Sequence, residues 1–255
     1  MRRLTALLFG TILLISFTAC ANPKMHEAAD GKTKALPIAE PDTDNQFGVD
    51  KNITIENIDA YLGREDTVYR DMRMLFDPAD YESIGGEADL SSTIQGFKVV
   101  PYPYIASLNT LPVSGAYDGD CLFAVQWAED GSIKMAKANY EESTMALEEL
   151  FPKDKNIILT CGGGGYAGMM RSLLIHLGWD ESKLYNIGGA WQYKGDNKLE
   201  MISYPEDANE DPIFATWRAN YAYIDFARLH KSADKNIGQG DSATDTGNEA
   251  EAAVQ

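Results

Sequence analysis

The sequence has little cysteine and little histidine, and both shortages exclude classes of protein. The chain contains three cysteines, Cys20, Cys121 and Cys161, which are too few for a disulfide framework. It also contains three histidines. The histidine nearest to Cys161, His176, is expected about 15 Å up the helix that follows Tyr166. A Cys-His hydrolase is therefore not favoured, unless His230 folds back onto Cys161.

Basic residues are also scarce. The chain has 22 Lys and Arg against 39 Asp and Glu, for a formal net charge of −17. Removal of Arg2 and Arg3 with an N-terminal signal would take this charge from −17 to −19. Nucleic acids and anionic lipid surfaces both bind positively charged protein surfaces, so no nucleic-acid partner is expected. The acidic surface is more simply interpreted as an aid to solubility.

Long apolar runs are absent except at the N-terminus. Arg2 and Arg3 precede an apolar run over residues 4–17, which is typical of a signal peptide and too short for a comfortable membrane span. The following Thr18-Ala19-Cys20 resembles the lipobox of bacterial lipoproteins, with Phe17 where leucine is usual. This resemblance implies that residues 1–19 are cleaved and that Cys20 is lipidated, which would anchor an exported protein to a membrane of the cell envelope. The alternative is an ordinary secretory signal with an incidental cysteine.

The two ends of the mature chain contain few large apolar residues. Residues 20–50 are predicted to be a disordered tether and residues 231–255 a disordered acidic tail. One domain is expected between them, over residues 51–230.

Within this domain, strand and helix patterns alternate. This order predicts an α/β fold, with a mainly parallel sheet covered by helices on both faces and an inserted β-hairpin. Strands are expected at residues 67–70, 97–100, 156–160, 184–187 and 199–203, the hairpin at 122–127 and 133–138, and helices at 54–62, 143–150, from Tyr166 to Leu177, and around a stripe of Phe214, Trp217, Tyr221 and Ile224.

The most informative segment follows the strand at residues 156–160 and reads Cys161-Gly-Gly-Gly-Gly-Tyr-Ala-Gly168. It places a single thiol on a glycine loop at the start of a helix. The unobstructed amides of the glycines and the positive helix end can hold an anion or a thiolate. We therefore expect the pKa of Cys161 to be lowered, so that Cys161 is a candidate nucleophile. The alternative is a buried, inert cysteine.

Three features together resemble the rhodanese-like domain. They are a strand that ends in Asp71-x-Arg73, a later strand that runs into Cys161, and a strand that ends in Gly188-Gly189 before Trp191. The resemblance covers roughly residues 52–200. It implies a sulfurtransferase or sulfane-sulfur carrier that forms a persulfide on Cys161, without a cofactor or metal. Its partners would be a small sulfur-containing anion and an acceptor thiol.

By the same resemblance, the loop that begins at the cysteine binds substrate, and Asp71 and Arg73 support it. The implied substrate-binding residues are Gly162, Gly163, Gly164, Gly165, Tyr166 and Ala167.

Two departures from the family pattern weaken the assignment of thiosulfate as donor. Residues 92–97 keep Gly96 but not the family's histidine, and the loop offers no Arg or Lys side chain to an anion. A second hypothesis is therefore a non-catalytic module of the same fold, which binds a small anion or a partner protein.

Other interpretations of the loop fit less well. A cysteine-dependent phosphatase needs an arginine where Ala167 stands. Gly163, Gly165 and Gly168 match the dinucleotide-binding pattern, but the next strand ends in glycines where an acid is required. A Walker A loop would need lysine in place of Met169.

Several roles stay open at this stage. Cys121 could resolve an oxidised Cys161 as a disulfide or be a packed thiol. Tyr166 could border the pocket or pack beneath the hairpin. Asp71 and Arg73 could also be an ordinary ion pair at a strand end.

Overall fold

The computed structural model describes residues 34–74, 81, 90–108, 114–203, 213–214 and 220–233. Its centre is a four-stranded parallel sheet with the order β3-β1-β6-β7. These strands span Lys98–Val99 (β3), Thr67–Asp71 (β1), Asn156–Cys161 (β6) and Leu184–Gly189 (β7). The parallel sheet predicted from alternating strands and helices is confirmed, and the fold is α/β.

The two strands that carry the glycine motifs are buried almost throughout. Every residue of β7 is buried, and every residue of β6 after Asn156. Continuous burial is typical of parallel strands covered on both faces, and it explains why the runs at 156–160 and 184–187 are apolar without alternation.

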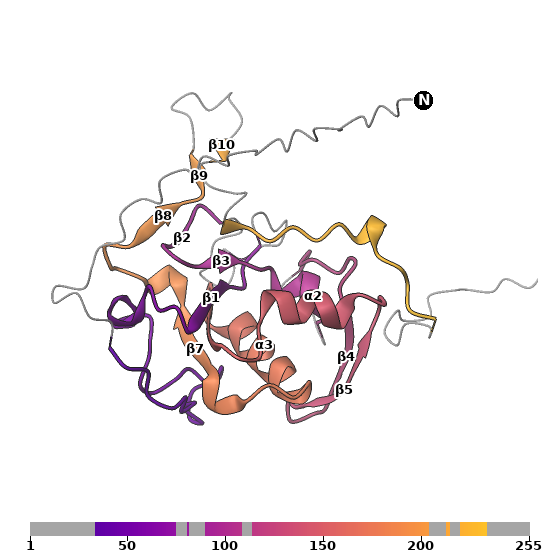
Figure 1. Cartoon of the computed structure of the whole chain (residues 1–255), viewed down its shortest axis with the longest axis horizontal. Coiled ribbons are helices and arrows are strands. Elements are labelled where there is room, and N and C mark those ends of the chain that lie inside the picture. The colour runs from indigo at the N-terminus through magenta and orange to yellow at the C-terminus, as the bar shows by residue number, and fades with distance from the viewer. Residues whose placement is uncertain are drawn as a thin grey trace, which may run out of the picture.

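The two faces of the sheet have different covers. Ile157 and Leu159 of β6 pack with three α-helices, whereas Ile158 between them packs with residues 53–61. The helices on the first face are α1 (Tyr102–Ile105), α2 (Ser143–Leu150) and α3 (Gly165–His176). Figure 1 shows α2, α3 and the hairpin on one side of the sheet and the indigo N-terminal segment on the other.

The prediction of helices on both faces is therefore wrong in part. The second face is covered by the short 3-10 helix η1 (Ile58–Tyr61) and by a chain of bends and turns before it, in place of the α-helix expected over residues 54–62. Ile53, Ile55 and Ile58 are buried against this face. Bends and turns over residues 51–57 therefore place these apolar side chains against the sheet without an α-helix.

The described part of the predicted tether is also folded. Asp50 is 2% exposed, and its carboxylate accepts hydrogen bonds from the amides of Glu40, Asn52 and Ile53. Residues 34–50 have few large apolar side chains, but hydrogen bonds to buried groups hold them in place. The folded unit thus begins earlier than residue 51, while residues 20–33 and the signal segment 1–19 lie outside the described residues.

The β-hairpin is present where it was predicted, with β4 at Phe123–Trp127 and β5 at Ile133–Ala138. Its register shifts between Gln126 and Trp127, which marks a bulge before the turn. The hairpin forms its own two-stranded sheet, and β5 lies against α3. Residues from both of its strands join the core on the helical face.

The last part of the chain differs from its prediction. The expected strand at 199–203 is divided into β8 (Lys198–Glu200), which pairs with β2 (Ser92–Ile94), and β9 (Ile202–Ser203), which pairs with β10 (Ile213–Phe214). The prediction of a C-terminal helix is wrong. Among the described residues of that stretch, only residue 220 is helical.

Phe214 belongs to a strand, Tyr221 pairs with Val99 at the edge of the sheet, and Ile224 is outside any helix. Pairing with the exposed edge of β3 satisfies backbone groups that a helix would satisfy internally. Trp217 lies outside the described residues, as do residues 234–255 of the predicted tail. The described residues also form the 3-10 helices η3 (Glu181–Lys183), η4 (Ala190–Gln192) and η5 (Phe226–Arg228).

None of the helices in the described ranges has the length and apolar character needed to cross a membrane.

Candidate functional site

The carboxyl ends of three parallel strands bring the predicted site residues to one edge of the sheet. Asp71 at the end of β1 is one residue out of register with Cys161, because its partner on β6 is Thr160. Cys161 in turn pairs with Gly189 of β7. Ligands of open α/β sheets bind beyond the carboxyl ends of the strands, so this edge is the candidate site.

Cys161 has the position predicted for it, between a strand and a helix start. Gly164 caps α3 with a left-handed φ of 100°, a conformation that glycine adopts without steric cost. The Gly164 amide then points back and donates a hydrogen bond to the Cys161 sulfur at 3.1 Å. The glycine loop thus directs backbone donors at the thiol.

The electrostatics of Cys161 differ from the prediction. Burial raises the pKa of the thiol, and the negative charge of Asp71 adds to that rise. Hydrogen bonds from the amides of Ala167, Gly164 and Tyr166 act in the opposite direction, as the loop was expected to do. Burial outweighs them, because a thiolate loses more hydration in a dry site than these amides return. The thiol is therefore protonated at neutral pH in this conformation.

Trp191 covers one side of the loop. A Cβ atom at Gly162 would overlap the indole ring of Trp191, so only glycine permits this close approach. Cys161 itself is 3% exposed, whereas Gly163 next to Trp191 is an exposed part of the loop.

Phe47 covers the other side. Its ring lies 3.5 Å from the Cβ position of Gly164 and 3.4 Å from that of Gly165, and its carbonyl oxygen is 2.6 Å from the Cβ position of Gly168. The first turn of α3 is therefore packed against a segment that the sequence had suggested to be a tether. A dinucleotide phosphate would need the space that Phe47 fills, which adds to the case against a dinucleotide site.

Asn186 connects these parts, and sequence reasoning missed it. Its amide nitrogen donates to the carbonyl oxygens of Phe47 at 2.8 Å and Gly164 at 3.1 Å, and its amide oxygen accepts from Gly188 at 3.0 Å. Asn186 is 1% exposed. A polar amide inside the apolar strand 184–187 was the signal that could have identified it, because buried amides need partners.

Asp71 and Arg73 form a buried ion pair beside the loop. The guanidinium Nη2 of Arg73 is 2.6 Å from Asp71 Oδ2, and Thr93 donates to the same oxygen at 2.8 Å. Arg73 also donates to the Ser92 carbonyl at 2.8 Å, which connects the end of β1 to β2. This arrangement fits a supporting role, in which the pair orders the strand ends around Cys161.

Tyr166 packs in the interior and also lies beside the loop. Its ring stacks on Tyr102 with centroids 5.6 Å apart, and its hydroxyl shares a hydrogen bond of 2.9 Å with that of Tyr81. Ala167 is fully buried, so it offers only its backbone amide to the site. Arg171 faces away and donates to the Leu184 carbonyl.

Cys121 lies in a different environment. Its sulfur donates to the Phe123 carbonyl at 3.3 Å, and burial raises the pKa of its thiol to about 11. Both cysteines of the domain are free. The third candidate, Cys20, lies outside the described residues.

Among the described residues, neither a histidine nor a metal-binding group of side chains lies beside Cys161 at this edge of the sheet. His230 Nδ1 is bonded to Glu142 at 2.6 Å, and His176 is exposed at the end of α3. In the described ranges, no three His, Cys, Asp or Glu side chains are grouped so as to hold a metal ion.

Comparisons with known proteins gave no match: no family model, no curated protein and no solved structure is significantly similar to this chain.

Proposed function

We propose that this protein is a sulfane-sulfur carrier or sulfurtransferase of the rhodanese-like type, which forms a persulfide on Cys161. The observation that supports the proposal most is the Gly164 amide, which donates to the Cys161 sulfur at 3.1 Å from a loop at the end of a central strand. Amides of Tyr166 and Ala167 also favour negative charge on this sulfur. A persulfide anion carries its charge near the same donors, and so it is stabilised by them.

The proposed reaction has two balanced displacements. First, the thiol of Cys161 loses its proton to water and attacks the outer sulfur of a sulfane donor. The S–S bond of the donor breaks, and the leaving group departs with the electron pair, as sulfite does from thiosulfate. A nucleophilic acceptor, such as a thiolate or cyanide, then attacks the outer sulfur and releases the Cys161 thiolate.

The loop favours donors that have no sulfonate group. The side chains of Gly162–Gly165 offer no cation, so a sulfonate group would be held by amides alone. We therefore expect polysulfide to load Cys161 more readily than thiosulfate does.

Intact-mass measurement tests the proposal. With Cys20 replaced by serine, so that only the two cysteines of the domain remain, the full chain should gain the mass of one sulfur atom after treatment with polysulfide. In this background, the Cys161→Ser variant should gain none, and the Cys121→Ser variant should behave as the parent chain. Absence of the added sulfur from the parent chain would rule out the catalytic proposal.

A second candidate function is a non-catalytic binding module of the same fold. It is favoured by the 3% exposure of Cys161 and by the raised pKa of its thiol, both of which suit an inert cysteine. Replacement of Cys161 by serine distinguishes the two functions, because a binding module should keep its ligand and a sulfur carrier should lose all activity.

We further propose that the chain is exported and anchored to a membrane through a lipid on Cys20, with residues 1–19 removed. The support is the sequence of the N-terminus alone. Mass analysis of the N-terminal peptide from the membrane fraction should find a diacylglycerol-modified Cys20. Recovery of the same peptide with an unmodified cysteine or an uncleaved signal would contradict this location.

A further inference from the structure

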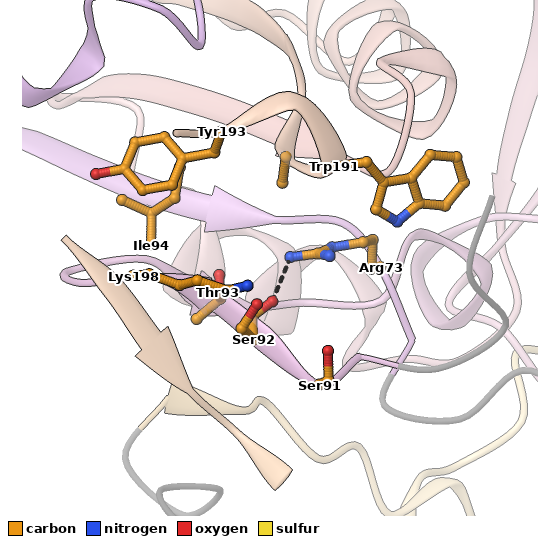
Figure 2. Close-up of a pocket in the computed structure, with 9 residues that line it drawn as sticks. Arg73, Ser91, Ser92, Thr93, Ile94, Trp191, Tyr193 and Lys198 are labelled. Atoms are coloured by element: carbon orange, nitrogen blue, oxygen red, sulfur yellow. Dashed lines mark hydrogen bonds between the residues drawn. The ribbon is translucent and has the colours of Figure 1, made fainter. Parts of the chain in front are cut away.

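A polar cavity of about 70 Å³ lies next to the Cys161 loop, and Cys161 does not line it. The cavity is enclosed by residues of β2, by Lys198 at the start of β8 and by the 3-10 helix η4 (Figure 2). The lining residues with polar side-chain groups are Arg73, Ser91, Ser92, Thr93, Trp191, Tyr193 and Lys198. A volume of this size holds only a small ligand of a few atoms.

The charge of the lining is positive. Two cations, Arg73 and Lys198, line the cavity, and none of the described residues that line it is a carboxylate. Asp71 offsets much of the charge of Arg73 through the ion pair between them. The excess of positive charge in the lining therefore comes from Lys198, which forms no ion pair within the described part of the chain. A local positive site in a chain of net charge −17 favours a negative ligand.

Trp191 provides an unsatisfied hydrogen-bond donor. Its indole nitrogen is buried and has no hydrogen-bond partner among the described residues. Figure 2 shows this nitrogen on the side of the ring that faces Arg73. A buried donor without an acceptor is unfavourable, so a ligand that supplies an acceptor here removes that penalty.

These features suit one chemical class. A small oxyanion has only acceptor oxygens, which match the indole N–H, the ammonium of Lys198 and the serine hydroxyls. It also has the negative charge that the lining favours and a size that fits the cavity. We propose that this cavity is a binding site for a small tetrahedral oxyanion of sulfur or phosphorus.

The site is separate from Cys161 but shares a wall with its loop. The indole ring that lines the cavity also rests on Gly162, next to Cys161. A bound oxyanion would therefore fix Trp191 over the loop. The site needs no reaction at Cys161, so it goes beyond the proposed sulfur chemistry and is independent of it.

The test is titration of the full chain, labelled with ¹⁵N at its four tryptophan indoles, with sulfate, thiosulfate or phosphate at constant ionic strength. The Cys161→Ser background prevents persulfide formation. We expect one indole N–H resonance to shift saturably, and that resonance should be the one absent from the Trp191→Phe variant. Tighter binding of sulfate than of phosphate assigns the site to sulfur oxyanions, and the reverse order assigns it to phosphate.

Lys198→Gln is the decisive variant, since Lys198 is exposed and its replacement should not disturb folding. Loss of one charge-assisted contact should weaken binding about tenfold. Lys194→Gln is the matched control, because Lys194 is exposed on the same segment but does not line the cavity. The proposal is overturned if sodium chloride alone reproduces the shift, if no saturable shift occurs, or if both lysine variants behave alike.

Discussion

The domain contains two buried, free cysteines whose surroundings differ. Cys161 is 3% exposed and Cys121 is 7% exposed, and burial raises the pKa of both thiols. Around Cys161, three backbone amides from a helix start favour the charged sulfur. Cys121 follows Asp120, whose charge further disfavours a thiolate, and its sulfur donates to a carbonyl.

Exposure therefore does not distinguish the two thiols. What separates them is the set of groups that would stabilise negative charge once a proton leaves. At Cys161 these groups are preorganised by the glycine loop, by Asn186 and by the cap of α3. This difference supports the proposed sulfur chemistry at Cys161 and favours a packing role for Cys121.

The largest expected difference is in turnover. With polysulfide as donor and cyanide as acceptor, Cys161→Ser should produce no thiocyanate above the uncatalysed rate. Cys121→Ser should keep turnover within about twofold of the wild type, because its thiol contributes no preorganised donors. Loss of turnover in both variants would instead support a resolving role for Cys121.

The second expected difference is in stability at the supporting ion pair. Arg73→Met leaves the fully buried Asp71 without its main partner, which should lower the free energy of unfolding by about 3–5 kcal/mol. The matched control is Lys51→Met, which breaks an exposed pair with Glu40 and should change stability by less than about 1 kcal/mol. Urea denaturation of both variants measures the difference, and equal losses would contradict the assigned support.

A smaller effect is expected when Asn186 is replaced, and Asn139 near Cys121 provides the comparison. Asn186→Ala leaves buried partners at Phe47, Gly164 and Gly188 unsatisfied and should destabilise the domain by about 2 kcal/mol. It should also slow persulfide formation, because the cap of α3 loosens.

Asn139→Ala is the control for this effect, since Asn139 donates to the Cys121 carbonyl and not to the loop. It should leave the rate of sulfur loading on Cys161 unchanged. A similar slowing in both variants would show that general destabilisation, and not the loop, sets the rate.

The smallest effect concerns pH. Because burial raises the pKa of both thiols, alkylation of each should accelerate with increasing pH, with the midpoint for Cys121 near 11. In the unfolded chain the Cys121 thiol ionises at its ordinary pKa of 9.0, which is lower than its pKa in the folded chain. Its contribution to stability is therefore complete below pH 9 and is lost as pH rises towards about 11. Cys121→Ser should remove that part of the loss. Rates of iodoacetamide labelling in single-cysteine variants provide the midpoints, and a midpoint for Cys161 below 9 would contradict its raised pKa.

The sequence was sufficient for the centre of this fold. A strand-like pattern at residues 67–70 and apolar runs at 156–160 and 184–187 predicted the parallel strands, and the turn between residues 127 and 133 predicted the hairpin. Local patterns of this kind depend on short-range spacing, which is visible in a single chain. The strand, loop and helix around Cys161 were predictable for the same reason.

Long-range contacts were not predictable. Phe47 and Asp50 lie in a stretch whose composition indicates disorder, yet they are fixed by Asn186 far along the chain. The pKa of Cys161 was predicted with the wrong sign, because the loop amides are local whereas burial depends on Trp191 and the whole core. The edge pairing of Tyr221 with Val99 likewise replaced an expected helix.

The central claim is that the amide loop, and not mere availability of a thiol, directs sulfur to Cys161. The most direct measurement is peptide-resolved mass spectrometry of the wild-type chain, loaded with limiting polysulfide and alkylated without reduction. The account predicts persulfide on the Cys161 peptide and none on the Cys121 peptide. Equal loading of the two cysteines, or loading of Cys121 alone, would contradict it.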